Sequence, residues 1–274
     1  FGTQIMMPGM GMGVMGAAIG TVSAELVAAS ITMYILCFRS KELSLRIDTG
    51  RFLPTWGVVK RALHISLPMG LQQTIMCSAY VMTTIIIAPL GTFAIAANSF
   101  GIIIESLCYM PGYGIADAAT TLVGQSMGAG RYELMKRFAW LSVGLGVTVM
   151  AVMGVVMYVG APVAMAMMTP AEEVRRLGVE VLRIEAFAEP MFAAAIVSYG
   201  VFVGAAKTLV PSIMNLVSIW GVRISLAAML APSMGLRGVW IAMCIELCFR
   251  GLIFLVKLKF WNIQTSCNHY GKDQ

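Results

Sequence analysis

Seven long apolar segments constrain the fold of this chain more than any other feature of its sequence. Each reaches the roughly 20 residues that a helix needs to cross the ~30 Å hydrocarbon core of a bilayer. Only helices and closed barrels satisfy their backbone hydrogen bonds in lipid, and these segments are too long for barrel strands. The sequence therefore predicts an all-α integral membrane protein with seven transmembrane helices, at residues 13–38, 65–90, 93–127, 138–161, 179–205, 209–230 and 236–258.

The composition supports a membrane protein and excludes several other classes. Apolar residues make up 59% of the 274 residues and charged residues 12%, against about 45–50% and about 25% in soluble domains. The net charge of +6 is spread between the apolar segments, so we expect no binding of nucleic acid. The six cysteines are scattered and show no zinc or disulfide spacing, so we expect no metal site.

The basic residues predict how the segments are oriented. Most Lys and Arg lie in alternate connections: the stretch 39–64, the turn that contains Arg131, the turn that contains Lys207, and the C-terminal tail. Basic connections face the cytoplasm, so we expect a multi-pass protein of the plasma or inner membrane with its C-terminus cytoplasmic. The chain opens with Phe1 instead of Met, and its first residues resemble the end of a loop, so we expect further sequence upstream.

The stretch 39–64 is the one long polar connection between the apolar segments. It contains Gly50, Pro54 and a short basic amphipathic part at 56–62. Two interpretations stay open, and one segment could satisfy both. It can be a solvated loop resting on anionic lipid headgroups, or a linker between two helical bundles.

The stretch 67–131 and a later helix end contain the most specific motifs. Leu-Pro-Met-Gly-Leu-Gln-Gln opens the stretch and Leu-Val-Gly-Gln-Ser-Met-Gly-Ala-Gly-Arg closes it, with Ala-Pro-Leu-Gly, Ala-Ile-Ala-Ala-Asn and Pro-Gly-Tyr-Gly between them. This pattern resembles the second half of the multidrug and toxic compound extrusion (MATE) family. Gly200 and Gly204, followed by Lys-Thr and Pro211, resemble the later glycine-rich helix end of that family.

The resemblance implies a domain organisation. Members of the family have twelve helices in two six-helix bundles, so the chain would be a MATE-like six-helix bundle preceded by one helix of the other bundle. By this comparison residues 1–38 hold the last helix of the N-terminal bundle, and 39–64 form the cytoplasmic linker between the bundles. Residues 65–260 form the C-terminal bundle, and 261–274 form a cytoplasmic tail. The remainder of the N-terminal bundle would be the missing partner.

Acidic side chains inside the apolar segments are the candidates for ion coupling. An ionisable side chain at bilayer depth costs about 2.5–3.5 kcal/mol on insertion scales, so it should face a cavity or a partner. Glu105 lies near the middle of the third segment and is either a proton- or cation-binding acid or a neutral or paired carboxyl. Glu189 precedes Pro190, which removes a helical hydrogen bond, and a broken helix beside an acid often coordinates a coupling ion. For Arg183 and Glu185 we favour a hydrated position at the outer interface.

Polar side chains at helical spacing are the candidates for substrate binding. They are Gln73, Cys77, Tyr80 and Thr84 in the second segment, Asn98 two turns before Glu105, and Tyr199 in the fifth segment. We select Gln73, Tyr80, Asn98 and Tyr199, although such groups can equally form interhelical hydrogen bonds.

Three further charges lie in the last two apolar segments. Glu246 and Arg250 are four residues apart, so we predict a local ion pair between them. Arg223 could neutralise either Glu105 or Glu246, and the sequence leaves this choice open.

The sequence differs from the pattern of the family at two positions. Some members of the family carry acids where Met76 and Phe192 align, and others use an aspartate of the first bundle. Glu105 and Glu189 would therefore be substitutes for these ligands.

Together these features predict a secondary transporter. We expect a proton- or sodium-coupled antiporter that exports small hydrophobic or cationic drugs by alternating access, with no cofactor besides the coupling ion. One alternative is a flippase of lipid-linked saccharides from the same superfamily, and a less favoured one is a seven-helix receptor. We do not expect an enzyme, because both histidines lie outside the apolar cores and no catalytic motif is present.

Overall fold

The computed structural model describes residues 13–39 and 56–261, which form helices and short turns with no strand among them. The predicted all-α fold is therefore confirmed. The chain divides into two compact units, Phe1–Val58 and Val59–Gln274. The expectations for the first residues, for most of the stretch 39–64 and for nearly all of the tail fall outside the described residues.

The first unit contains one apolar helix. This helix, α2 (Gly13–Tyr34), continues as the short π-helix η1 (Ile35–Arg39). Together they cover the predicted segment 13–38. The described apolar part, Ala18–Tyr34, is shorter than a full membrane span.

The second unit opens with three long helices. Helix α3 (Trp56–Ile87) incorporates the amphipathic stretch that the sequence placed in the linker, and ends in the 3₁₀ turn η2 (Ala88–Leu90). Gly91 then adopts a φ of 98°, which a glycine tolerates without strain. Helices α4 (Thr92–Gly128) and α5 (Tyr132–Met168) follow, each longer than a bilayer requires.

The next predicted span is a broken helix. Helices α6 (Glu172–Glu185) and α7 (Glu189–Gly204) meet at an angle of 59°. The break falls directly before Pro190, which lacks the backbone N–H that a continuous helix would use. The predicted interruption beside Glu189 is therefore present.

The last two spans lie on either side of a glycine turn. Helix α8 (Leu209–Leu216), the π-helix η3 (Val217–Ile224) and α9 (Ser225–Met234) form one apolar stretch, Leu209–Met234. Gly235 turns the chain with a φ of 62°, and α10 (Leu236–Lys259) completes the unit.

The second unit contains several helices that can cross a membrane. In the described residues five helices are long and apolar enough to cross a membrane, and six if the bent pair α6–α7 counts as one. The chain is thus a multi-pass membrane protein, and these six spans lie within the predicted bundle at 65–260. The full count of seven is not confirmed, because it depends on α2.

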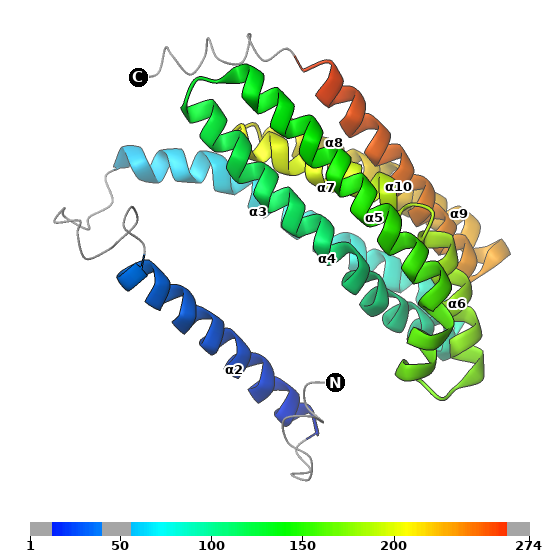
Figure 1. Ribbon diagram of the computed structural model, residues 1–274. Helices are drawn as coiled ribbons and strands as arrows, with labels where there is room; N and C mark the ends of the chain where they lie inside the picture. Colours follow the sequence, from blue (N-terminus) through cyan, green and yellow to red (C-terminus); the bar gives the residue numbers. More distant parts are fainter. Residues whose placement is uncertain (1–12, 40–55, 262–274) are drawn as a thin grey trace. The chain divides into compact units, whose positions relative to one another are not determined.

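Helix α7 lies at the centre of the second unit, where it packs against α4, α5 and α10 (Figure 1). Its side chains are small enough for close approach, and Ala193 and Ala194 have no exposed surface. Small residues at helix contacts are typical of membrane bundles, where packing replaces the hydrophobic drive between helices.

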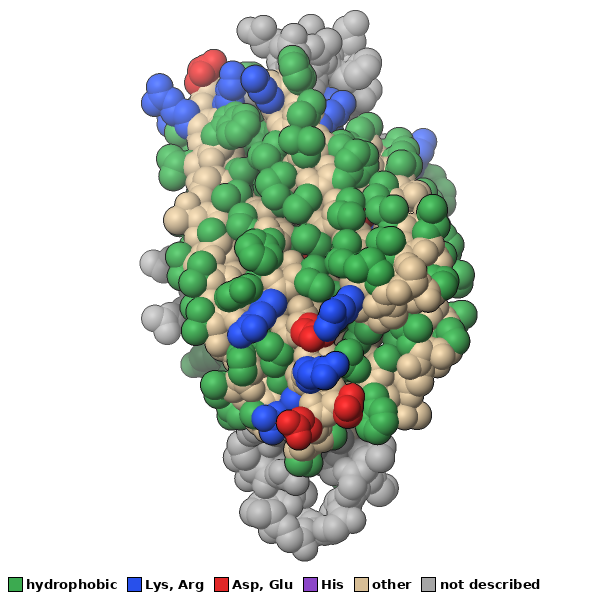
Figure 2. Space-filling model, turned by 90° about the vertical axis from the view of Figure 1, so that its right-hand side faces the viewer, with side chains coloured by type: hydrophobic (Ala, Val, Ile, Leu, Met, Phe, Trp, Pro, Cys, Tyr) green, Lys and Arg blue, Asp and Glu red, His purple; other side chains and the backbone are tan. Residues whose placement is uncertain are grey.

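The outer surface of the second unit is apolar. Val159 and Leu141 of α5 are 70% and 68% exposed, and Figure 2 shows hydrophobic side chains covering the middle of one face. Lys and Arg gather at its upper end, whereas acidic and basic side chains mix in its lower part. A surface of this kind is solvated by lipid.

Candidate functional site

A cavity of about 240 Å³ opens between α3, α4, α7 and α10. Pockets for drug-sized ligands usually measure about 300–1,000 Å³, so this one can hold part of such a molecule. Its lining combines amides, phenols, apolar side chains and charges. The lining residues are Gln72, Gln73, Met76, Tyr80, Ile102, Glu105, Tyr109, Tyr113, Phe192, Ala195, Ile196, Tyr199, Asn215, Arg223, Met243, Leu247 and Arg250.

The two predicted acids and a third one lie close together. Glu105 is 6% exposed, and Glu185 and Glu189 are each 1% exposed. The three carboxyls come from α4, α6 and α7, and their charges act on one another. The charge of Arg223 also acts on Glu105 and Glu185. Within the described residues, neither oxygen of Glu185 or Glu189 has a hydrogen-bond partner.

The break between α6 and α7 brings Glu185 and Glu189 inside the bundle. Helix α5 approaches this break at Gly154, where an added Cβ would lie 2.7 Å from the Ala186 carbonyl oxygen and 3.3 Å from Glu189 Cβ. Any residue larger than glycine would push this segment away. Gly154 therefore allows α5 to pack directly against the acids.

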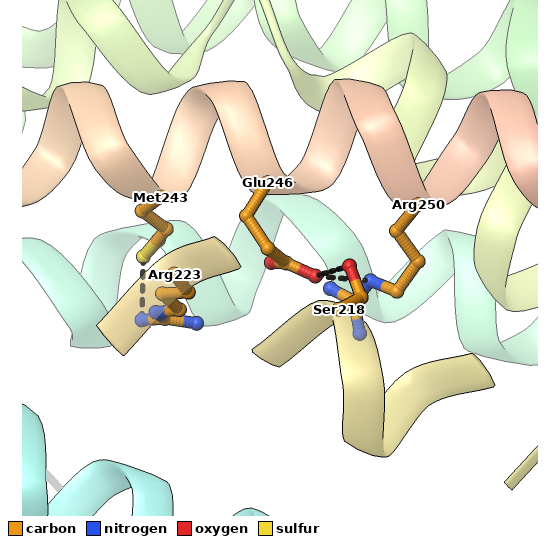
Figure 3. A network of polar contacts seen from close by, with 5 residues as sticks. All are labelled: Ser218, Arg223, Met243, Glu246 and Arg250. Carbon is orange, nitrogen blue, oxygen red and sulfur yellow. Dashed lines mark hydrogen bonds and ion pairs between the residues drawn. The ribbon is translucent and has the colours of Figure 1, made fainter. Parts of the chain in front are cut away.

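The carboxyl of Glu246 lies in a polar network with Ser218 and Arg250 (Figure 3). Its Oε1 atom is 3.1 Å from Arg250 Nε and accepts a hydrogen bond of 2.6 Å from Ser218 Oγ. The predicted ion pair between Glu246 and Arg250 is therefore confirmed. Arg250 itself reaches the cavity.

Arg223 forms no ion pair with Glu105 or Glu246, the two acids considered for it, although its charge acts on Glu105 from a longer distance. Its Nη2 donates to Met243 Sδ at 2.7 Å, and its guanidinium lies 5.9 Å from the centre of the Tyr80 ring. The π-helix η3 places this side chain at the wall of the cavity. π-Helical segments often occur at functional sites.

The structure brings most of the predicted substrate-binding residues to one cavity. Gln73, Tyr80 and Tyr199 line it together with Glu105. Asn98 lines a neighbouring cavity of about 80 Å³, which shares Tyr80 with the first.

Asn98 and Glu189 lie outside the lining of the larger cavity. The Oδ1 atom of Asn98 accepts a hydrogen bond of 3.1 Å from Trp240 Nε1, so this amide also joins α4 to α10. Glu189 is buried but lines neither of these two cavities, and the same holds for Glu185.

The prediction that Glu185 lies at a hydrated interface is wrong. Glu185 is buried and not at a hydrated interface, because the break after α6 turns it inward, whereas Arg183 is exposed and lies over the Tyr158 ring. Met76 and Phe192, the aligned positions without an acid, both line the cavity that Glu105 reaches from α4.

Sequence reasoning missed several cavity residues. Arg223 and Arg250 were considered only as partners of acids, yet both line the cavity, as do Gln72 and Tyr113. The signal that could have found Arg223 is its place in an apolar span, where a charge usually marks a functional site.

Comparisons with known proteins place this geometry in a family. Residues 68–229 match the family described as MatE. The chain is 28% identical over 250 residues to a protein of Thermotoga maritima described as "Probable multidrug resistance protein NorM", covering 89% of this chain and 53% of that protein. A protein of Brucella suis with the same description is 30% identical over 240 residues, covering 84% and 50%.

A solved structure shares the fold. A MATE crystal structure in complex with MaL6 aligns with a TM-score of 0.83 at 20% identity, covering 97% of this chain and 60% of that one. The chain spans about half the length of the relatives named above.

Proposed function

Because the chain belongs to the MatE family, we propose that it forms the C-terminal part of an antiporter that exports small hydrophobic or cationic drugs. Members of this family are secondary transporters and not enzymes. Family membership also removes the ground for the receptor alternative. The descriptions of the relatives as multidrug resistance proteins support drug export.

The observation that carries this proposal is a buried acid at the wall of a cavity. Glu105 lines the cavity from the middle of α4, together with Gln73, Tyr80 and Tyr199. Phenols and amides can contact varied organic molecules from several directions, and the carboxylate adds an attraction for a cationic group.

We further propose that protons or sodium ions drive the export through the same acids. A carboxyl buried without partners is costly to keep charged, so a bound cation stabilises the site. Glu105 lines the cavity, whereas Glu185 and Glu189 are buried outside its lining and have no hydrogen-bond partners among the described residues. A cation on this cluster and a cationic drug at Glu105 would compete, which couples the two movements.

Alternating access requires a second body that rocks against this bundle. We propose that a preceding six-helix bundle, of which α2 would be the last helix, supplies it.

Replacing Glu105 by Gln in the complete protein tests the role of the acid. Glutamine keeps the size and polarity of the side chain but cannot carry the charge. We expect ion-driven dye efflux to fall about tenfold or more, within the usual range of coupling energies, while the amount of protein in the membrane is unchanged. The measurement is dye efflux from cells that lack their own exporters.

The matched control is Glu133→Gln, because Glu133 is exposed in the first turn of α5. This control should export the dye like the wild type. Normal efflux and normal drug resistance in the Glu105→Gln variant would reject the proposed role of the acid.

A further inference from the structure

The cavity that contains Glu105 also contains two arginines. Arg223 comes from η3 and Arg250 from α10, and both line the cavity of about 240 Å³. Glu105 is the only acid among the residues that line it. The lining thus carries two positive groups and one negative group, whereas a site that binds only cations would carry mainly negative groups.

The charge of Arg250 is already balanced. Its Nε lies 3.1 Å from Glu246 Oε1, and its guanidinium lies 5.5 Å from the centre of the Phe192 ring. Glu246 has no exposed surface, so it serves as a fixed counter-charge behind the cavity wall. Arg250 contributes little free attraction to a ligand.

The charge of Arg223 is not balanced in the same way. No carboxylate of the described residues lies within ion-pair distance of its guanidinium. Its Nη2 donates to Met243 Sδ, and a thioether sulfur is only a weak acceptor. Its Nε is buried and has no hydrogen-bond partner among the described residues.

Glu105 and Glu185 attract the guanidinium of Arg223 only from beyond ion-pair distance. An anion that reaches it therefore gains a direct charge pairing and hydrogen bonds. Arg223 also borders the neighbouring cavity of about 80 Å³. A ligand in the larger cavity therefore meets this group where the two cavities join.

We propose that Arg223 binds an anionic oxygen group of the substrate, such as a carboxylate. This proposal rests on the proposed export function and narrows its substrate class to those hydrophobic or cationic drugs that also carry such an anionic group. The apolar part of the molecule then lies against the aromatic lining formed by Tyr109, Tyr113 and Phe192. When the anion binds, Arg223 exchanges its weak hydrogen bond to Met243 Sδ for a stronger one to the anionic oxygen.

A matched pair of dyes tests this proposal. The complete protein in phosphatidylcholine nanodiscs is titrated with a carboxylate-bearing xanthene dye and with its methyl ester, and fluorescence polarisation gives both affinities. We expect the acid to bind about tenfold more tightly than the ester, because a hydrogen bond between charged groups is stronger than one between neutral groups. Arg223→Gln should remove this preference and leave the affinity for the ester within about twofold.

Two further variants and an exchange of the lipid test whether the preference for the acid dye depends on Arg223. Arg223→Lys keeps the charge and should retain part of the preference for the acid. Arg237→Gln should bind both dyes like the wild type, because Arg237 is an exposed residue paired with Glu180 outside the cavity. Exchange of the discs to phosphatidylglycerol should leave the preference in place, whereas its loss would assign Arg223 to a lipid headgroup and overturn the proposal.

The outcomes separate this inference from the proposed function. If both dyes bind but Arg223→Gln changes their affinities equally or not at all, the inference is wrong and the export function stands. If neither dye binds the wild type, and neither is exported from cells, both proposals fail.

Discussion

Glu246 has no exposed side-chain surface, so its charge depends on the groups packed around it. Arg250 supplies the opposite charge and Ser218 supplies a hydroxyl hydrogen bond of 2.6 Å (Figure 3). In this way one carboxyl joins α10 to η3 within the bundle. Removing one partner of a buried pair leaves the other charge uncompensated, which is costly.

Replacing Glu246 by Leu should therefore destabilise the protein strongly. Loss of one partner from a buried ion pair typically costs about 3–5 kcal/mol. The measurement is thermal unfolding in detergent micelles. The control is Glu180→Leu, which breaks the pair with Arg237 at the surface, where such pairs contribute about 0–1 kcal/mol.

The account of this pair is wrong if Glu246→Leu and Glu180→Leu unfold at the same temperature. A double variant, Glu246→Leu with Arg250→Met, should recover part of the loss because it removes both buried charges together.

The sequence predicts contacts between residues when the geometry is local. Glu246 and Arg250 are one helical turn apart, so their spacing alone predicted the pair. Glu185 and Glu189 have the same spacing, but the chain bends by 59° between their helices. The burial of Glu185 follows from that bend and from the packing of α5, which a sequence pattern does not contain.

Helices α4 and α7 approach each other closely along two glycines. An added Cβ at Gly200 would lie 2.6 Å from the Ala116 carbonyl oxygen, and one at Gly204 would collide with the backbone of Thr120. Thr120 Oγ1 also lies 2.9 Å from the carbonyl oxygens of both Ala116 and Gly200. Backbones approach this closely in membrane bundles only where small residues face each other.

Replacing Gly200 by Val should separate α4 from α7 and lower the stability of the protein. Overpacking of a tight contact costs typically about 1–3 kcal/mol. Thermal unfolding of the purified protein measures the loss. The matched control is Gly144→Val on α5, where an added Cβ meets no atom within 4 Å. Equal unfolding temperatures for the two variants would show that the contact tolerates a larger side chain.

The elements themselves were largely predictable, because long apolar runs can only be helices in lipid. The interruption before α7 was also predictable from Pro190, which cannot continue the hydrogen-bond pattern. The π-helix η3 was not, since its sequence, Val217–Ile224, contains neither proline nor a charge pattern that marks a widened turn. Its position decides where Arg223 enters the cavity, so this part of the site depends on tertiary packing.

At the scale of the whole molecule, the second unit combines an apolar exterior with a polar interior. Side chains such as Val159 face outward, whereas Glu105, Glu185, Glu189 and Glu246 are buried. The lipid surface could be predicted from composition alone. The convergence of three acids from separate helices could not, because it depends on how α4, α6 and α7 pack.

We propose that an ion gradient drives export through this cavity, so gradient-driven transport by the reconstituted protein is the decisive measurement. The complete protein is reconstituted in liposomes, and dye movement is followed after a proton gradient or a sodium gradient is imposed. The account predicts that at least one gradient moves the dye against its own concentration difference, and that an ionophore which collapses this gradient stops the movement. Dye that moves only down its concentration difference, at a rate that neither gradient changes, would contradict the account.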